Sequence, residues 1–429
     1  MTLLDLTPRI HAGTRLDSLP VAIIGAGPMG LAAAAHLARR GIAFTILEKG
    51  DTIADAVRQW GHTRLFSPWQ HLVDDEAAAL LADDGWEAPA PTVAPSGSDL
   101  VTQYLEPLAA HPAIAPHIRL GSTVTSVSRE GMDRTRTQGR SQKPFALRIT
   151  SADGSAADVP ARAVLDASGT WSQPNPLGSS GIEPLGTDSV RDLIVPALPD
   201  VLGRDRDRFA GRRTTVVGAG HSAANTLIAL ATLARLEPGT HVTWLIRNAQ
   251  AQRVQTADDE LEGRGALGSR VEQLVASGRV EVVDSFEITS LARQGDGVRA
   301  TSTTGEKHDA DLLVANTGFR PDLTPLRELR LDLDDIVEAP RRLAPMIDPN
   351  EHSCGTVDPH GYRELSHPEA GFFIVGMKSY GRAPTFLLKT GYEQVRSVVA
   401  WIAGDAEAAG RVELTLPATG VCNVDGGCC

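Results

Sequence analysis

The chain has 429 residues, 42% of them hydrophobic and 22% charged, which is enough for two or three globular domains. Its 41 basic and 53 acidic residues give a formal net charge of −12, which disfavours nucleic acid and anionic membranes as partners. No apolar run approaches the roughly 20 residues of a membrane span, and the first residues lack a secretion-signal pattern. We therefore expect a cytoplasmic protein.

The most informative segment begins at residues 21–24, a short apolar run that predicts a strand buried on both faces. Three glycines in the spacing G-x-G-x-x-G follow it at Gly25, Gly27 and Gly30. The next residues are rich in Ala and Leu and predict a helix that ends at Gly41. This order is typical of a dinucleotide-binding βαβ unit, whose glycines permit a tight turn, the approach of a pyrophosphate and close helix packing.

A second apolar strand, at residues 42–47, ends at Glu48. A carboxylate at this place can accept hydrogen bonds from both hydroxyls of a ribose. The N-terminus of the preceding helix carries a partial positive charge that attracts phosphate groups. We therefore interpret residues 21–48 as the first of two nucleotide sites.

The pattern returns in residues 212–230, where alanine, an allowed variant, replaces the third glycine. The residues predicted for this second site are Gly218, Gly220, Ser222 and Ala223. The following strand ends in Arg247, whereas the first unit ends in Glu48. A carboxylate repels a 2′-phosphate and arginine binds it through a planar fork, so the sequence predicts FAD at the first site and NADPH at the second. Arg212 and Arg213 are alternative ligands for the 2′-phosphate.

Each half of the chain also contains a matching apolar strand after a β-rich stretch. The two segments read "ARAVLDASGTWSQPNP" and "DADLLVANTGFRPD". Each strand is followed by a turn of small residues, at Gly169 or Gly318, and then by a proline. The match indicates an internal duplication, and we expect the two strands to close the two nucleotide domains.

Up to about residue 410, the chain resembles the two-dinucleotide-binding-domain flavoproteins, the superfamily of flavin-containing monooxygenases, thioredoxin reductases and mercuric reductases. The resemblance implies an α/β fold of glutathione reductase type. Its two Rossmann-like domains have three ββα layers, and the NADPH domain is inserted into a split FAD domain. The implied limits are 15–180 and 325–410 for the FAD domain, 205–325 for the NADPH domain and 411–429 for a C-terminal tail.

The same resemblance implies further site residues. The segment "AVRQWGHTRLFSPW" places Trp60 and Ser67 near the isoalloxazine, and the closing segment from residue 371 places Gly376 near the pyrophosphate. A helix that starts near Thr385 would direct its positive end at the flavin. The titratable side chains in or near these stretches are candidates for catalytic groups, without a ranking: His62, His71, Cys354, Lys378 and Tyr380.

Two departures separate the chain from the standard branches of the superfamily. Residues 1–353 contain no cysteine, although the disulfide reductases carry a C-x4-C or C-x2-C pair beside the flavin. The F-x-G-x3-H-x3-Y/F signature of the flavin monooxygenases is also incomplete, because "RFAGRRTTVVG" keeps F-x-G and has no matching histidine. The sequence therefore leaves open whether electrons pass to O2 or to thiols.

The C-terminal tail contains three of the four cysteines, Cys422, Cys428 and Cys429, and two glycines between them. Three converging thiolates suit a soft ion such as arsenite or Hg²⁺, whereas zinc needs a fourth ligand. A passive tail and a redox-active thiol pair are the alternatives. The stretches "PDVLGRDRDRFAGRRTTVVGAGHSA", "GMKSYGRAPTFLLKTGYEQVRSVVA" and "LPATGVC" resemble flavin-dependent monooxygenases of bacterial arsenic-resistance clusters.

We therefore expect an enzyme that oxidises NADPH through FAD and passes electrons to O2, with a trivalent arsenical or another small molecule as substrate. One alternative is an NADPH-dependent disulfide or metalloid reductase that uses the tail thiols. Another is a thiol-based metalloid-binding protein whose flavin is structural or sensory. The family resemblance, and a tail that can act in trans, also suggest a homodimer.

Overall fold

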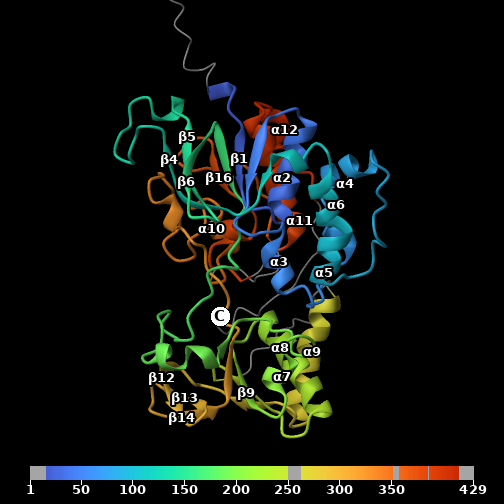
Figure 1. The fold of residues 1–429 in the computed structure, drawn as a ribbon, viewed down its shortest axis with the longest axis vertical. Coiled ribbons are helices and arrows are strands. Elements are labelled where there is room, and N and C mark those ends of the chain that lie inside the picture. Colours follow the sequence, from blue (N-terminus) through green and yellow to red (C-terminus); the bar gives the residue numbers. More distant parts are fainter. Residues whose placement is uncertain (1–15, 250–261, 351–356, 385, 415–429) are drawn as a thin grey trace, which may run out of the picture.

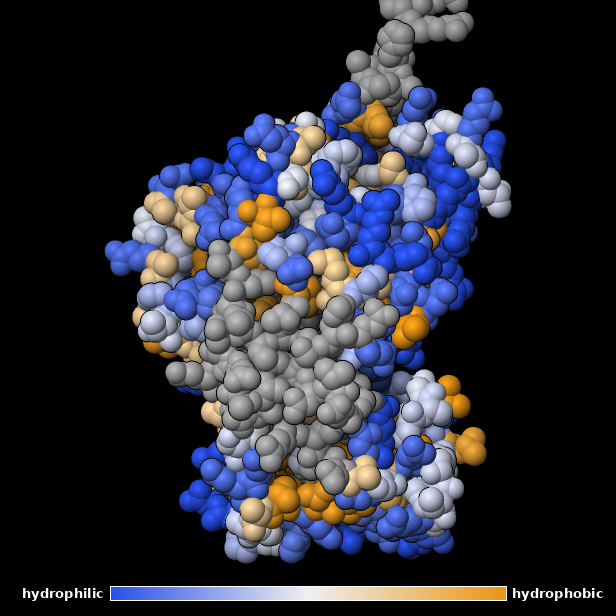
Figure 2. All heavy atoms as spheres, turned by 180° about the vertical axis from the view of Figure 1, so that it is seen from behind, coloured by the Kyte–Doolittle hydropathy of each residue, from blue (hydrophilic) through white to orange (hydrophobic). Residues whose placement is uncertain are grey.

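The computed structural model describes residues 16–249, 262–350, 357–384 and 386–414, and these form two lobes (Figure 1). The surface in Figure 2 is largely hydrophilic outside the grey residues, with apolar side chains in small groups. Within the described ranges, no helix is long and apolar enough to cross a membrane.

The first lobe is built on a parallel five-stranded sheet in the order β16-β7-β1-β2-β3. Its strands are β1 (Val21–Ile24), β2 (Phe44–Leu47), β3 (Ile118–Arg119), β7 (Ala163–Asp166) and β16 (Phe372–Ile374). Since β16 comes from the far end of the chain, this domain is split in sequence. The second lobe is formed by residues between β7 and β16, whereas Leu326, Leu329 and Val337 already pack in the cores of the first lobe again.

Strand β1 shows why the first domain has three layers. Val21 and Ile23 point into the core shared with the helices, whereas Ala22 and Ile24 join a second core under an antiparallel sheet. That sheet consists of β4 (Ser122–Arg129), β5 (Phe145–Ser151) and β6 (Ala156–Ala161). The main helices on the other face are α2 (Pro28–Arg39), α4 (Asp75–Ala82), α6 (Glu106–Ala110) and α11 (Leu388–Ile402). A strand buried on both faces was the sequence prediction for residues 21–24, and it is confirmed.

The second lobe repeats this plan with the parallel order β11-β10-β9-β15-β8. Its elements are β8 (Ile194–Val195), α7 (Arg206–Phe209), β9 (Arg213–Val217), α8 (His221–Leu236), β10 (His241–Leu245), α9 (Glu262–Ala276), β11 (Glu281–Val283) and β15 (Leu312–Ala315). The antiparallel layer consists of β12 (Ile288–Gln294), β13 (Gly297–Ser302) and β14 (Lys307–Ala310). Strand β8 precedes residue 205, the expected start of this domain, and the domain limits remain a prediction. The duplicated α/β fold is confirmed.

The remaining short elements join these layers: α3 (Asp55–Gln59), α5 (Gly97–Leu100), a π-helical turn (Val101–Leu105), α10 (Ala344–Ile347), the 3-10 turn η7 (Gly376–Tyr380) and α12 (Ala406–Gly410). Element bounds differ from the sequence predictions by a few residues. Strand β2 begins at Phe44 because Phe44 pairs with Val21, the first residue of β1. The last long helix begins at Leu388, after Leu387 in extended backbone, three residues later than the predicted start near Thr385.

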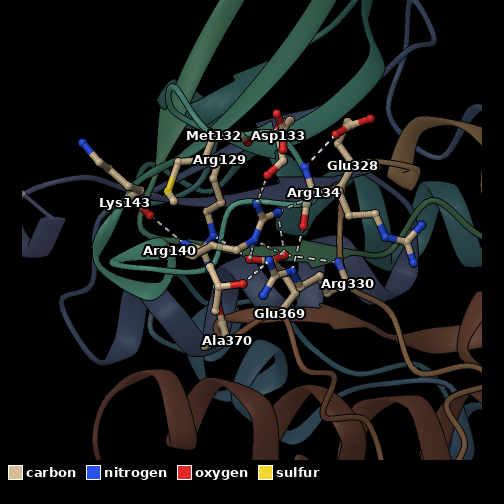
Figure 3. A network of polar contacts seen from close by, with 12 residues as sticks. Arg129, Met132, Asp133, Arg134, Arg140, Lys143, Glu328, Arg330, Glu369 and Ala370 are labelled. Carbon is tan, nitrogen blue, oxygen red and sulfur yellow. Dashed lines mark hydrogen bonds and ion pairs between the residues drawn. The ribbon is translucent and has the colours of Figure 1, made fainter.

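A buried ionic network ties the two halves of the split domain together (Figure 3). Glu369, just before β16, accepts from Arg129 Nε of β4 at 2.8 Å and from Arg140 Nε at 2.9 Å. Both guanidinium groups also donate to backbone carbonyls, those of Lys143 and Asp133 among them. Because every charge has partners, the network can hold the antiparallel layer against the closing strand without an isolated buried charge.

Candidate functional site

The first glycine motif joins β1 to α2, and each of its glycines has a separate structural reason. Gly25 has φ +99°, and a Cβ there would lie 2.9 Å from the carbonyl oxygen of Ala167. A Cβ on Gly30 would lie 1.9 Å from the carbonyl oxygen of Gly25. Gly27, by contrast, has no atom within 4 Å of where its Cβ would be. The turn thus leaves open space at the N-terminus of α2, where a pyrophosphate fits.

Glu48 follows β2 and lies against this turn. Its carboxylate is buried and accepts hydrogen bonds from the backbone N–H of Ala26 at 2.7 Å and of Gly50 at 2.8 Å, one on each oxygen. A carboxylate oxygen has two acceptor positions, so each can still accept a ribose hydroxyl. The geometry therefore fits the role predicted for Glu48.

The closing segment meets the glycine turn at Met29, in the first turn of α2. A Cβ on Gly376 would lie 2.5 Å from Met29 Cγ, and one on Gly391 of α11 would lie 2.3 Å from Met29 Sδ. Met29 thus fits between two glycines, and the first turns of α2 and α11 come together at the carboxyl end of the sheet. Two helix N-termini that lie this close together favour an anionic ligand beside them.

The structure buries two of the catalytic candidates. The Lys378 ammonium lies 2.7 Å from Asp166 Oδ2 and 3.1 Å from Ser168 Oγ, and burial raises the pKa of the Tyr380 hydroxyl above its usual value. Of the two histidines, His62 is exposed, while partial burial and the charge of Lys389 lower the pKa of His71.

The other predicted residues fall into two groups. Trp60 packs on Gly97, where a Cβ would lie 2.8 Å from the indole, and Ser67 is buried in the segment that follows. The remaining candidates lie outside the described residues: Cys354, Thr385, Cys422, Cys428 and Cys429. Among the residues that are described, no cluster of three or more His, Cys, Asp or Glu side chains is placed to hold a metal ion.

The second glycine motif repeats the first in detail. Gly218 has φ +121°, a Cβ there would lie 2.1 Å from the carbonyl oxygen of Asn316, and Gly220 again faces open space. Ala223 is fully buried, as its role in close helix packing requires, and Ser222 lies in the first turn of α8. The indole of Trp244 donates to the Gly218 carbonyl at 2.7 Å, an anchor that sequence reasoning missed.

The three arginines considered as ligands of the 2′-phosphate lie at opposite ends of the second parallel sheet. Arg247 is exposed and follows β10, on the same side as the glycine turn. Arg213 begins β9, and its guanidinium pairs with Asp311 at 2.9 Å. Because Arg213 and its neighbour Arg212 lie at the amino end of the strand, their placement disfavours them as ligands of a nucleotide at Gly218.

The carboxyl ends of the two sheets face a common junction. The turn at Gly169 leads into Trp171, whose ring centroid lies 4.8 Å from that of Phe319, just after Gly318. Phe66 of the first lobe lies 5.5 Å from His221, the first residue of α8. Sequence reasoning missed these aromatic contacts, which join the turns at Gly169 and Gly318 and bring Phe66 beside the first residue of α8.

Comparisons with known proteins agree with this geometry. A rice (Oryza sativa subsp. japonica) indole-3-pyruvate monooxygenase is 26% identical over 62% of this chain, and the match spans 56% of the rice protein. A ferredoxin–NADP reductase of Granulibacter bethesdensis is 28% identical over 78% of this chain and 80% of its own length. Bacillithiol disulfide reductase from Bacillus cereus has a similar fold, with TM-score 0.66 and 19% identity over 90% of this chain and 99% of its own.

The family model of the pyridine nucleotide-disulphide oxidoreductases matches residues 22–354, which is most of the chain. The matched region contains both glycine turns and both return strands, the parts of the structure that fit FAD and NADPH. The chain belongs to the pyridine nucleotide-disulphide oxidoreductase family.

Proposed function

We propose that this enzyme is an FAD-dependent monooxygenase that takes electrons from NADPH and uses O2 to oxygenate a small molecule. The observation that carries the proposal is the junction of the two lobes, where Trp171 contacts Phe319 and Phe66 contacts His221, in a chain without a cysteine in residues 1–353. Without a thiol pair in that part of the chain, a diffusible acceptor such as O2 suits the site better than a protein disulfide. The rice relative, named a monooxygenase, supports the same reading.

The residue roles follow from the geometry. FAD, when bound, supplies the two-electron redox chemistry. We assign its pyrophosphate to the open space at Gly27 and its ribose to Glu48, while Trp60 and Ser67 would border the isoalloxazine. The turns at Gly169 and Gly376, with Thr385, complete the assigned FAD site. NADPH is assigned to the residues Gly218, Gly220, Ser222, Arg247 and Gly318.

Replacing Arg247 by glutamate tests the NADPH assignment. The 2′-phosphate would lose a charge-assisted hydrogen bond and gain a repulsive carboxylate, so we expect the KM for NADPH to rise about 30-fold or more and the KM for NADH by less than about threefold. Steady-state kinetics with both coenzymes give the two values. Arg213→Glu is the matched control and should leave the preference unchanged. Equal losses with NADPH and NADH in the Arg247 variant would contradict the assignment.

For the substrate, we propose a trivalent arsenical captured by Cys422, Cys428 and Cys429, since soft thiolates favour a soft metalloid. The balanced reaction consumes arsenite, O2, NADPH and one proton, and it yields arsenate, NADP⁺ and water. We expect one arsenate for each NADPH oxidised in air and none without O2. The double variant Cys428→Ser/Cys429→Ser should raise the KM for arsenite about tenfold or more.

The same assay discriminates the rival functions. Anaerobic NADPH oxidation with a disulfide or ferredoxin as acceptor, unaffected by arsenite, would identify a reductase and contradict the monooxygenase. The Granulibacter relative, named a ferredoxin–NADP reductase, makes ferredoxin the acceptor to include. A protein that binds arsenite but neither oxidises NADPH nor reduces its flavin would be a metalloid-binding protein. Oxygenation of other small molecules without arsenite turnover would keep the reaction class and exclude the arsenical.

A further inference from the structure

A buried ion pair lies at the carboxyl end of the first sheet, where four strand ends meet the glycine turn. The side chains of Asp166, the last residue of β7, and Lys378, within η7, are 2% and 3% exposed, and Lys378 Nζ lies 2.7 Å from Asp166 Oδ2. The other carboxylate oxygen accepts from Ser168 Oγ at 2.6 Å and from its backbone N–H at 3.1 Å. Lys378 Nζ also lies 3.1 Å from Ser168 Oγ.

These contacts connect the closing segment to the glycine turn. A Cβ on Gly25 would lie 3.1 Å from Ser168 Cα. The glycine turn therefore packs against Ser168, one of the two residues that contact the Lys378 ammonium. From the other side, Gln394 of α11 accepts from the Gly376 N–H at 2.8 Å and donates to Ser379 Oγ at 2.9 Å. The turn η7 is thus held between β7 and α11, and its first residue, Gly376, packs on Met29, two residues after Gly27.

The second domain offers an internal comparison. Asp166 pairs with Ile24, the residue before Gly25, and Ala315 pairs with Val217, the residue before Gly218. Asp166 therefore corresponds to Ala315, and the NADPH domain has no acid at this place. The second domain forms its glycine turn without an acid at this place. The ion pair is therefore particular to the domain that we assign to FAD and is not needed for a glycine turn as such.

Stability of the fold does not explain such a pair. Two buried charges cost desolvation energy, and replacing a buried ion pair by neutral side chains of similar volume is often neutral or stabilising. The ionic network around Glu369 lies at the opposite end of β16, where it joins distant segments of the chain. The pair of Asp166 and Lys378 instead lies at the edge where a dinucleotide binds a parallel sheet, and perturbed or buried ionisable groups gather at such functional sites.

We propose that Lys378 is a positioning residue of the FAD site: its bonds to Asp166 and Ser168 fix η7 against the glycine turn and so preform the surface that binds the ADP half of FAD. The proposal rests on FAD occupying the first site. It replaces the earlier candidacy of Lys378 as a catalytic acid or base. Loss of Lys378 therefore weakens cofactor binding, while NADP⁺ binding in the other domain is unaffected.

The test is a double-mutant cycle of Lys378→Met, Asp166→Asn and the double variant. Binding of FAD and of ADP to the apoprotein, binding of NADP⁺, and the midpoint of thermal unfolding are measured for each protein. Lys378→Met leaves a buried unpaired carboxylate, so its midpoint should fall, and the double variant should recover it because both charges are gone. We expect the double variant still to bind FAD and ADP about tenfold more weakly or worse, with NADP⁺ affinity within about twofold of the wild type.

Recovery of FAD affinity together with stability in the double variant would overturn the proposal, because the pair would then serve only the fold. Unchanged FAD affinity in Lys378→Met would overturn it as well. Arg382→Met is the matched control, since Arg382 lies in the same closing segment and its ion pair with Glu338 is partly exposed; it should bind FAD normally. None of these measurements involves turnover, so their outcome is independent of whether the enzyme oxygenates its substrate. A wild-type protein that binds no FAD would instead refute the FAD assignment.

Discussion

The variant Glu48→Lys is expected to fold and to lose FAD, with the dissociation constant raised about 100-fold or more. The carboxylate accepts the N–H groups of Ala26 and Gly50 in this structure, and we assign its remaining acceptor positions to the ribose. Hydrogen bonds to a charged group contribute about 1.5–3 kcal/mol each. A lysine ammonium cannot accept any of these bonds and would compete for space beside the glycine turn.

Flavin absorbance of the purified protein and titration of the apoprotein with FAD measure this loss. Glu48→Gln is the milder companion, since one amide oxygen can still accept, and it should lose less affinity than the lysine variant. Glu76→Lys, at a side chain of α4 that is 44% exposed, controls for the charge change itself. Circular dichroism and NADP⁺ binding establish that the second domain is intact. A yellow, FAD-loaded Glu48→Lys protein would contradict the role of Glu48.

The nucleotide turns could be predicted because their parts are contiguous in sequence. Strand β1, Gly25, Gly27, Gly30, α2 and Glu48 lie within 28 residues of one another, from Val21 to Glu48. Local backbone requirements and strand burial determine the order of these parts, so the sequence pattern alone is enough to predict the turn. The same holds for the second motif, which repeats that order with Ala223 in place of the last glycine.

The contacts between distant segments could not be predicted in the same way. Lys378 attracted notice as a titratable group near the flavin segment, but its partner Asp166 lies 212 residues earlier. A signal for Asp166 does exist, because aligning "AVLDASG" with "LLVANTG" places an acid in the first repeat opposite an alanine in the second. The contact of Phe66 with His221 depends on how the two lobes pack, and no local pattern encodes it.

A comparably large loss of cofactor affinity is expected when valine replaces the middle glycine of each turn. Gly27 and Gly220 both precede a helix in extended backbone, with φ of −85° and −86°, a conformation that β-branched residues favour. Neither has an atom within 4 Å of where a Cβ would lie. Valine should therefore fit the empty protein and occupy the space that we assign to a pyrophosphate.

Gly27→Val should thus purify without FAD, with its FAD affinity lowered about 100-fold or more, because the valine side chain excludes the phosphate from the helix N-terminus. It should nevertheless unfold at the same temperature as the wild-type apoprotein. Gly220→Val should keep FAD and show a similar rise in the dissociation constant for NADPH. Gly30→Ala provides the contrast, because its Cβ would collide with the Gly25 carbonyl in the folded chain itself, so it should lower stability before any ligand is added.

The pair of valine variants decides the order of the two cofactors along the chain. Loss of NADPH in Gly27→Val and loss of FAD in Gly220→Val would reverse the assignment that Glu48 and Arg247 support. Retention of both cofactors in both variants would place the pyrophosphates elsewhere. We expect each valine to remove one cofactor and to spare the other, because the middle glycine has the same backbone conformation and open space in both turns. The flanking groups differ: an acid and a buried lysine pair in one domain, an exposed arginine in the other.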